Sequence, residues 1–170
     1  MDWNSELGTL LHIGLAALLG GIVGMEREWH HKAAGLRTHM FVSAGAALFV
    51  YAARIASLKF MESLGDKIEV DPIRVLQAII IGVSFIGAGT IIQLHDEGKV
   101  QNLTTAASIF FVTGVGVVTA LEQYITAVGL AFLGVLINWG VNVFERKAFK
   151  NESDDKTKAP REEEPSRSQP

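Results

Sequence analysis

The feature that most constrains the fold is Val75–Leu94, a run of twenty residues that contains no charged side chain. A helix of about twenty residues spans about 30 Å, which is the thickness of the hydrocarbon core of a bilayer. The run follows Asp71, a residue type that caps helix N-termini, and Pro72, which suits a first helical turn. The sequence therefore predicts a transmembrane helix whose start is formed by Asp71, Pro72 and Arg74.

Composition indicates that this run is one of several spans. Apolar residues make up 49% of the chain and occur in blocks with charges between them, which is typical of a polytopic membrane protein. The chain has no cysteine, which excludes a disulfide framework and thiolate chemistry. The N-terminus has no basic region and no evident cleavage site, so we expect the first apolar run to be a retained span.

We expect an all-α polytopic membrane protein with about five transmembrane helices. The predicted spans are residues 7–25, 40–58, 75–94, 103–121 and 124–144. Residues 1–150 form the predicted transmembrane domain. Residues 151–170 contain almost no apolar side chain, so we expect a disordered, charged cytoplasmic tail.

The segment between the first two spans, residues 26–39, is too polar to cross a membrane. We expect it to form a short interfacial helix that ends at Gly35, with Trp29 at the membrane–water boundary. Glu28 and Lys32 are four residues apart and are expected to pair on the surface of that helix.

Small residues recur in two of the predicted spans. In membranes, glycine and similar residues let helix backbones approach closely, and a GxxxG spacing is typical of such contacts. The first span has this spacing, and the third span has a run of small residues at its centre that includes Ser84 and Ala88. The predicted helix-packing positions are Gly20, Gly24, Gly82, Gly87 and Gly89.

The distribution of basic residues predicts the orientation. Loops rich in Lys and Arg tend to stay in the cytoplasm. The N-terminal flank has none, whereas the first loop and the C-terminal flank hold Arg27, Lys32, Arg37, Arg146, Lys147 and Lys150. We therefore expect the N-terminus outside and the C-terminus in the cytoplasm. The region between the second and third spans is the weak point, because its three basic residues argue against this scheme.

With this orientation, two motifs that are far apart in the sequence meet at the cytoplasmic face. The motifs are GMERE…AGLRTH and LTTAAS, and the first of them contains a guanidinium and carboxylates that can pair. Threonine hydroxyls in the second can cap the fourth helix or join the network. The predicted polar cluster consists of Glu26, Arg27, Glu28, Arg37, Thr38, Gln93, Asn102, Thr104 and Thr105. Two interpretations remain open: these residues anchor helix ends, or they bind a partner or an anionic ligand.

Motifs for catalysis and cofactors are weak in this sequence. The G-x-G of FIGAGTI follows no strand and lies within a span, so it does not indicate a phosphate loop. Glu26, His30 and His31 have no further ligand at the spacing of a closed metal site. We therefore expect no enzyme, no catalytic residue, no cofactor, no metal site and no nucleic-acid partner.

Transport is the more serious alternative. No Asp or Glu lies inside a predicted span, whereas ion sites at membrane depth and Mg²⁺ sites in particular favour carboxylates. The polar residues within the spans are His12, Gln77, Ser84, Thr90, Thr113, Asn138 and Asn142. This set is a poor match for a magnesium site, although an ionisable residue such as His12 at membrane depth is a functional candidate.

Five motifs in a fixed order resemble the MgtC/SapB family of bacterial inner-membrane proteins. They are GGIVGMERE (20–28), AGLRTHMFVSAGAALF (34–49), DPIRV (71–75), GVSFIGAGTII (82–92) and LTTAAS (103–108), and the resemblance covers roughly residues 10–140. It implies a membrane protein linked to growth in low magnesium and to virulence. It further implies a regulator that acts through other membrane proteins, among them the F-type ATP synthase, and not a magnesium transporter itself.

The chain departs from the family pattern at a few positions. The family commonly has Gly at the position of Ser84 and Arg-Gly at the position of Gln101-Asn102. Longer members carry a folded C-terminal domain that resembles ACT domains. This chain has only the charged segment 151–170 at that position, so we expect it to resemble the short, SapB-like form of the family.

We therefore expect an inner-membrane, homo-oligomeric regulator surrounded by lipid. Its expected partner is another inner-membrane protein, with the F-type ATP synthase or a transporter as candidates. The alternative is a small ion transporter or channel for Mg²⁺ or another cation, in which His12 and the glycine-rich third span line a path.

The expected orientation is testable with reporter fusions. Because the basic flanks favour a cytoplasmic C-terminus, a fusion after Pro170 is expected to report the cytoplasm and a fusion at Gly65 the opposite side. Paired alkaline phosphatase and fluorescent protein reporters measure this directly. A periplasmic signal from the Pro170 fusion contradicts the predicted topology.

Overall fold

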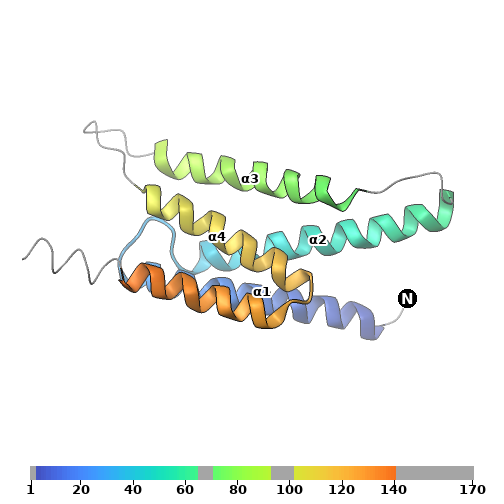
Figure 1. Cartoon of the computed structure of the whole chain (residues 1–170), viewed down its shortest axis with the longest axis horizontal. Coiled ribbons are helices and arrows are strands. Elements are labelled where there is room, and N and C mark those ends of the chain that lie inside the picture. Colours follow the sequence, from blue (N-terminus) through green and yellow to red (C-terminus); the bar gives the residue numbers. More distant parts are fainter. Residues whose placement is uncertain (1–2, 65–70, 93–101, 141–170) are drawn as a thin grey trace, which may run out of the picture. The chain divides into compact units, whose positions relative to one another are not determined.

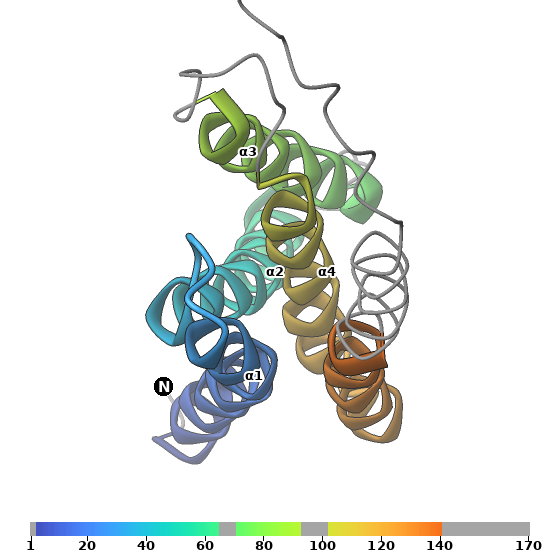
Figure 2. The same cartoon turned by 90° about the vertical axis from the view of Figure 1, so that its left-hand side faces the viewer.

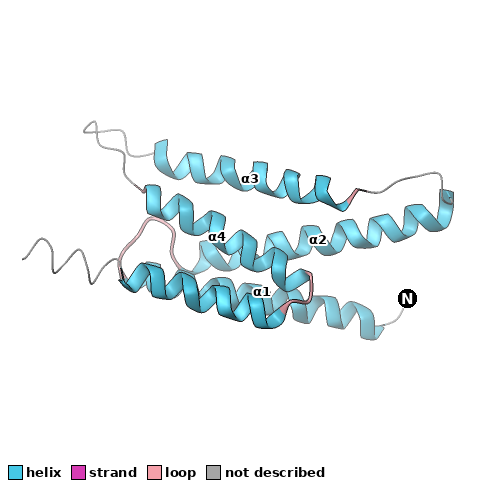
Figure 3. Cartoon of the chain, viewed as in Figure 1, coloured by secondary structure: helices cyan, strands magenta, loops and turns pink. Residues whose placement is uncertain are grey.

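The computed structural model describes residues 3–64, 71–92 and 102–140, and these residues are helical apart from short turns. The helices are α1 (Trp3–Trp29), α2 (Leu36–Leu64), α3 (Pro72–Ile92), α4 (Leu103–Ala120) and a fifth helix over Tyr124–Gly140 (Figures 1 and 3). Helices α1 to α4 are long and apolar enough to cross a membrane. The expected all-helical membrane architecture with five helices is thus confirmed. The predicted tail and Gln93 lie outside the described residues.

Helices α1, α2 and α4 form the packed centre. The contact between α1 and α2 is the most extensive, and α4 packs against both of them. Helix α3 contacts α4 and, more lightly, α2, but it does not contact α1 (Figure 2). Only 11% of the membrane-spanning window of α3 is buried, compared with 50% for α4. The structure therefore combines a tight three-helix centre with a loosely attached α3.

A seam of contacts repeated every four residues holds α1 and α2 together. Residues four apart lie on one face of a helix, and small side chains there let the two backbones approach. A Cβ atom at Gly20 would lie 2.5 Å from the Cβ of Ser43 and 2.6 Å from the carbonyl oxygen of His39. Across the seam, the α1 residues Gly24, Gly20, Ala16 and His12 face the α2 residues His39, Ser43, Ala47 and Tyr51.

Helix α4 packs onto this seam through a glycine of its own. A Cβ atom at Gly116 would collide with the backbone carbonyl of Ser43 and would lie 3.1 Å from the Cβ of Ala46. One turn further along α4, Ala120 is buried with Ala16, Ala47 and Tyr51. The fifth helix adds a second apolar cluster, formed by Leu19, Val115, Ala127 and Ala131.

The glycines of α3 differ from this pattern. A Cβ atom at Gly87 would lie 3.6 Å from the Cβ of Ala106, an ordinary contact distance between α3 and α4. At Gly82 and Gly89, a Cβ atom would meet nothing within 4 Å among the described residues. Among the described residues, no helix of this chain packs closely on Gly82 or Gly89, so their helix-packing role stays a prediction. The spacing of small residues in one span does not say which face a neighbour covers.

The start of α3 is capped locally. An oxygen of the Asp71 side chain accepts a hydrogen bond from the backbone N–H of Ile73 at 2.9 Å, and its backbone carbonyl accepts one from the N–H of Arg74 at 3.2 Å. The Arg74 guanidinium lies 3.7 Å from the Asp71 carboxylate. Pro72 occupies the first helical position, where its missing N–H costs nothing.

The turn between α1 and α2 differs from the expectation. The predicted interfacial helix ending at Gly35 is absent from the described turn, because α1 continues to Trp29 and α2 begins at Leu36. His31 has a left-handed backbone (φ 52°), and the N–H groups of His31 and Lys32 donate to the carbonyls of Glu28 and Arg27, as in a Schellman motif.

The Glu28 carboxylate connects this turn to α2. It accepts a hydrogen bond of 2.7 Å from the backbone N–H of Leu36 and so caps the start of α2. A Cβ atom at Gly35 would lie 2.8 Å from the same oxygen, so glycine leaves room for this cap. The expected pair between Glu28 and Lys32 is therefore replaced by a helix cap.

The close packing at the seam predicts that alanine substitutions at two glycines of α1 differ in their effect on the stability of the fold. Gly20→Ala places a Cβ against Ser43 and is expected to lower the free energy of unfolding by about 1–3 kcal/mol, the usual cost of overpacking. Gly14→Ala is the matched control, because a Cβ there meets nothing within 4 Å. Thermal unfolding in detergent micelles measures both. Equal melting temperatures for the two variants would show that the seam is not tightly packed.

Candidate functional site

The predicted polar cluster lies at one end of the bundle, where α1 ends and α2 and α4 begin. Its members differ in how far they are buried within the protein. Arg27 is 3% exposed and Thr105 is fully buried, whereas Glu28, Arg37 and Thr104 are exposed. Glu26, Thr38 and Asn102 are intermediate. The buried part of the site is thus formed by α1 and α4 residues, joined by a residue of α2 that the sequence pattern did not single out.

That residue is His39, which is fully buried. Its Nδ1 lies 2.8 Å from the carbonyl oxygen of Gly35, and because a carbonyl only accepts, Nδ1 carries a hydrogen and donates. Its Nε2 lies 3.0 Å from the Oγ of Ser108 on α4. His39 therefore connects the start of α2 to the first turns of α4.

Ser108 can serve either protonation state of His39. Its Oγ lies 2.8 Å from the carbonyl oxygen of Thr105 as well as beside His39. When the imidazole is neutral, the hydroxyl can donate to Nε2. When the imidazole is protonated, Nε2 donates to the hydroxyl, which then donates to Thr105. Both arrangements keep α2 and α4 joined.

A second set of contacts surrounds Glu26 at the end of α1. The Nδ1 of His30 lies 3.0 Å from a carboxylate oxygen of Glu26 and 2.9 Å from its backbone carbonyl oxygen, so Nδ1 is a donor to both. Arg27 Nη1 lies 4.0 Å from the other carboxylate oxygen. The site therefore places a nearly buried guanidinium and carboxylate beside His39, whose electrostatic environment includes both charges.

Two buried hydroxyls have no hydrogen-bond partner within the described part of the chain. They are the Oγ of Ser43 and the Oγ1 of Thr105, both on fully buried residues. An unsatisfied buried polar group costs free energy, so such positions are candidates for a ligand or a partner group. Of the two, Thr105 lies in the first turn of α4, at the end of the bundle, whereas Ser43 is enclosed by Gly20 and Gly116.

We name as the polar end cluster the side chains whose contacts are described above for this end of the bundle, together with Thr105. They are Glu26, Arg27, His30, His39, Thr105 and Ser108.

Two expectations about this region are corrected. Arg37 is exposed and forms no ion pair with Glu26 or Glu28 among the described residues. His39 faces α1, and Arg37, two residues earlier, lies on the opposite side of α2. The threonines do not cap α4. Asn102 precedes the helix in a left-handed conformation (φ 62°) without a side-chain cap, and its amide donates instead to the Thr90 carbonyl of α3 at 3.3 Å.

Sequence reasoning missed His39, Ser43 and Ser108. A usable signal exists for the first two, because they are four residues apart on α2 and complement the spacing of Gly20 and Gly24. Polar residues in a span usually face the bundle interior.

The opposite end of the seam holds a second polar group. His12 Nδ1 lies 2.7 Å from the hydroxyl of Tyr51, and His12 Nε2 lies 2.7 Å from the hydroxyl of Tyr124 on the fifth helix. The ring of Tyr51 stacks on His12 with an angle of 8° between the planes. Both ring nitrogens are thus engaged in joining three helices. Because α1 does not contact α3 in the described chain, His12 does not pack against the α3 glycines.

The contacts of the polar end cluster predict that Ser108→Ala and Thr105→Val, both on α4, lower the free energy of unfolding by different amounts. Ser108→Ala leaves the Nε2 of buried His39 without its partner and is expected to cost about 1–3 kcal/mol. Thr105→Val keeps the shape and removes a hydroxyl that has no partner, so its cost is expected to be small. Melting temperatures in the same detergent compare them. A larger loss for Thr105→Val would mean that its hydroxyl has a structural partner.

Comparison with known proteins identifies the family. The family model described as "MgtC family" matches residues 13–147. The chain is 32% identical over 142 residues to the protein named "Putative magnesium transporter YhiD" of Escherichia coli K12, a match that covers 83% of this chain and 62% of YhiD. It is 33% identical over 129 residues to "Protein MgtC" of Salmonella typhimurium, covering 76% of this chain and 50% of that protein.

A third relative is "Protein SapB" of Bacillus subtilis, 32% identical over 124 residues, covering 73% of this chain and 52% of SapB. The chain therefore spans about half to three fifths of the length of these curated relatives, and length does not set SapB apart from MgtC. No solved structure matches the chain. On the family match and these identities, the chain belongs to the MgtC family.

Proposed function

We propose that this protein is a regulatory inner-membrane protein, linked to growth in low magnesium and to virulence, that binds and modulates another membrane protein. In this proposal it acts without catalysis and does not itself carry ions. The F-type ATP synthase or a transporter is the first candidate partner, on the resemblance to the MgtC/SapB family. A homo-oligomer is the proposed assembly.

The closeness of the helices in the three-helix centre carries this proposal. Gly20, Ser43 and Gly116 bring three backbones so near one another that a single added Cβ would collide. The histidines above and below this level are held by hydrogen bonds to neighbouring side chains. Packing this close leaves an ion no passage between α1, α2 and α4. It therefore supports a role in which the protein binds a partner through its surface.

The polar end cluster is the proposed working surface for the partner. It places a carboxylate, a guanidinium and an unpartnered threonine hydroxyl at the junction of three helix ends. Because Thr105 is fully buried, a partner's hydrogen-bonding group would reach its hydroxyl only when the helix ends move apart. The exposed guanidinium of Arg37 in the neighbouring turn is a contact that a partner can reach without such a movement.

Growth at limiting magnesium tests the cluster. Thr105→Val, Arg37→Ala and Glu26→Gln are expected to reduce growth support in a strain that lacks its own copy, while the proteins still accumulate in the membrane. Thr113→Val is the matched control for Thr105→Val, since Thr113 lies on the same helix, is buried, and donates to the Ile109 carbonyl of its own helix. Full growth support by all three variants contradicts the proposed working surface.

Ion transport is the second candidate function, and the name of YhiD supports it. Purified protein in liposomes with a Mg²⁺-sensitive dye inside distinguishes the two functions. The regulatory proposal expects no more Mg²⁺ entry than in protein-free liposomes. Entry that rises with the amount of protein would overturn it, and the growth defects would then be read as transport defects.

A further inference from the structure

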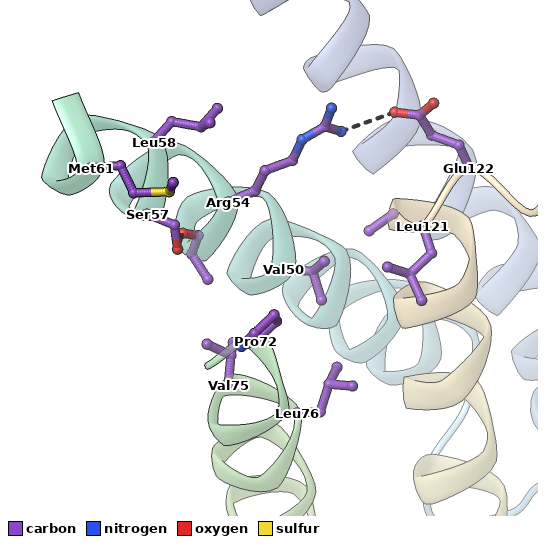
Figure 4. Close-up of a pocket in the computed structure, with 12 residues that line it drawn as sticks. Val50, Arg54, Ser57, Leu58, Met61, Pro72, Val75, Leu76, Leu121 and Glu122 are labelled. Carbon is purple, nitrogen blue, oxygen red and sulfur yellow. Dashed lines mark hydrogen bonds and ion pairs between the residues drawn. The ribbon is translucent and has the colours of Figure 1, made fainter. Parts of the chain in front are cut away.

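A cavity with two chemically different ends lies beside the three-helix centre. It has a volume of about 510 Å³, is open on one side, and is lined by α2, the start of α3 and the end of α4 (Figure 4). Most of its wall is aliphatic, and Arg54 and Glu122 stand together at one side. The apolar wall includes Val50, Leu58, Met61, Leu76 and Leu121.

The charged side of the cavity is an ion pair that keeps unused donors. Arg54 Nη1 donates to a carboxylate oxygen of Glu122 at 3.1 Å, and the two side chains are 60% and 51% exposed. A guanidinium has five N–H donors, and within the described residues this contact uses only Nη1. An exposed pair of this kind contributes little to stability, so it leaves both groups available to a ligand.

Glu122 occupies an unusual backbone position. It has φ 63°, and the N–H groups of Glu122 and Gln123 donate to the carbonyls of Thr119 and Val118 at the end of α4. Glycine is the residue that this left-handed helix end favours. The backbone therefore does not explain why a carboxylate stands here, opposite an arginine of α2.

A second cavity continues from the first along α2 and α3. It has a volume of about 840 Å³, and Ala53 and Val75 line both cavities. Its wall is entirely apolar among the described residues, with Phe49 and Ile79 on its two sides and Gly82 at its α3 face. Together the two cavities form a groove that changes from a charged end to an apolar interior. We name it the α2–α3 groove.

We infer that the α2–α3 groove binds one phospholipid with a zwitterionic headgroup, phosphatidylethanolamine. The phosphate lies at the free donors of Arg54, the primary ammonium lies at the Glu122 carboxylate, and an acyl chain fills the groove beyond Ala53. Arginine matches phosphate geometry, and a carboxylate accepts from an ammonium, so the ion pair complements both charges of this headgroup.

The position of the groove agrees with this occupant. Its charged end lies where α4 ends at Ala120 and α3 begins at Pro72, and helix ends lie at the level of lipid headgroups. The lipid also accounts for the slight contact between α2 and α3. Helix α3 has a buried share of only 11% in its spanning window, and an acyl chain in the groove would supply the missing packing.

Lipid binding to the purified full chain tests this inference. Delipidated protein in detergent is titrated with phosphatidylethanolamine, phosphatidylglycerol or phosphatidylcholine, and bound lipid is counted by native mass spectrometry. Phosphatidylethanolamine is expected to bind about ten-fold more tightly than either of the others, as the loss of one charge-assisted hydrogen bond implies. Phosphatidylglycerol has no cation for Glu122, and the methylated ammonium of phosphatidylcholine cannot donate to it.

Four variants assign the effect to the groove. Arg54→Gln and Glu122→Gln are expected to weaken phosphatidylethanolamine binding about ten-fold each, and Glu122→Gln to remove the preference over phosphatidylglycerol. Ser57→Leu fills the cavity and is expected to weaken all three lipids. Lys59→Gln is the matched control, since Lys59 is an exposed cation of α2 that lines neither cavity, and it is expected to leave the binding of all three lipids unchanged.

Helicity and elution volume identify variants that still fold, and only these are compared. Equal affinity for the three lipids, or variants that bind as the wild type does, would overturn the inference. A photo-crosslinker at Phe49 provides an independent measurement on native membranes. Because Phe49 is 60% exposed, bulk lipid also reaches it, so crosslinking to phosphatidylethanolamine above its share of the membrane lipid supports the inference. A share equal to that of the membrane, or a polypeptide as the main product, would overturn it.

Discussion

The close approach of α1 and α2 is the interaction on which the rest of the structure depends. In a bilayer, apolar side chains gain little by leaving lipid for one another, so helices associate through tight packing and hydrogen bonds. The seam provides this with glycine and alanine at successive turns of α1 and with Ser43 and Ala47 opposite them. Because the seam is narrow, Gly116 can bring α4 against the backbone of α2.

Both ends of the seam close with a histidine that bonds to another helix. His12 bonds to Tyr51 and Tyr124, and His39 bonds to Ser108. Hydrogen bonds of this kind fix which helices meet and at which level, a specificity that small residues alone do not provide. These two histidines are thus used for assembly, which leaves the helix ends and the outer faces as the surfaces available for binding.

The sequence predicts the parts of the fold that depend on one segment at a time. The length of the Val75–Leu94 run and the cap at Asp71 are local properties, and so is the spacing of Gly20 and Gly24. Whether Gly82 contacts another helix depends on which face of α3 the other helices cover. The sequence of α3 alone does not contain that information. The exposure of Arg37 depends on which face of α2 packs against α1, and the contacts of His39 and Ser43 with Gly24 and Gly20 set that face.

The tight centre and the loose α3 have different physical roles. A helix held by many close contacts has one position, whereas a helix held by few contacts and a groove has a position that depends on what fills the groove. In the two proposals, the lipid fills the α2–α3 groove and the partner binds at the polar end cluster. Asn102, at the start of α4, donates to the Thr90 carbonyl of α3, so a change in the position of α3 would act on the helix end that carries Thr105. The binding free energies of lipid and partner are then coupled through α3. This makes α3 the element through which the surrounding membrane can influence the partner, while α1, α2 and α4 keep the polar end cluster in place.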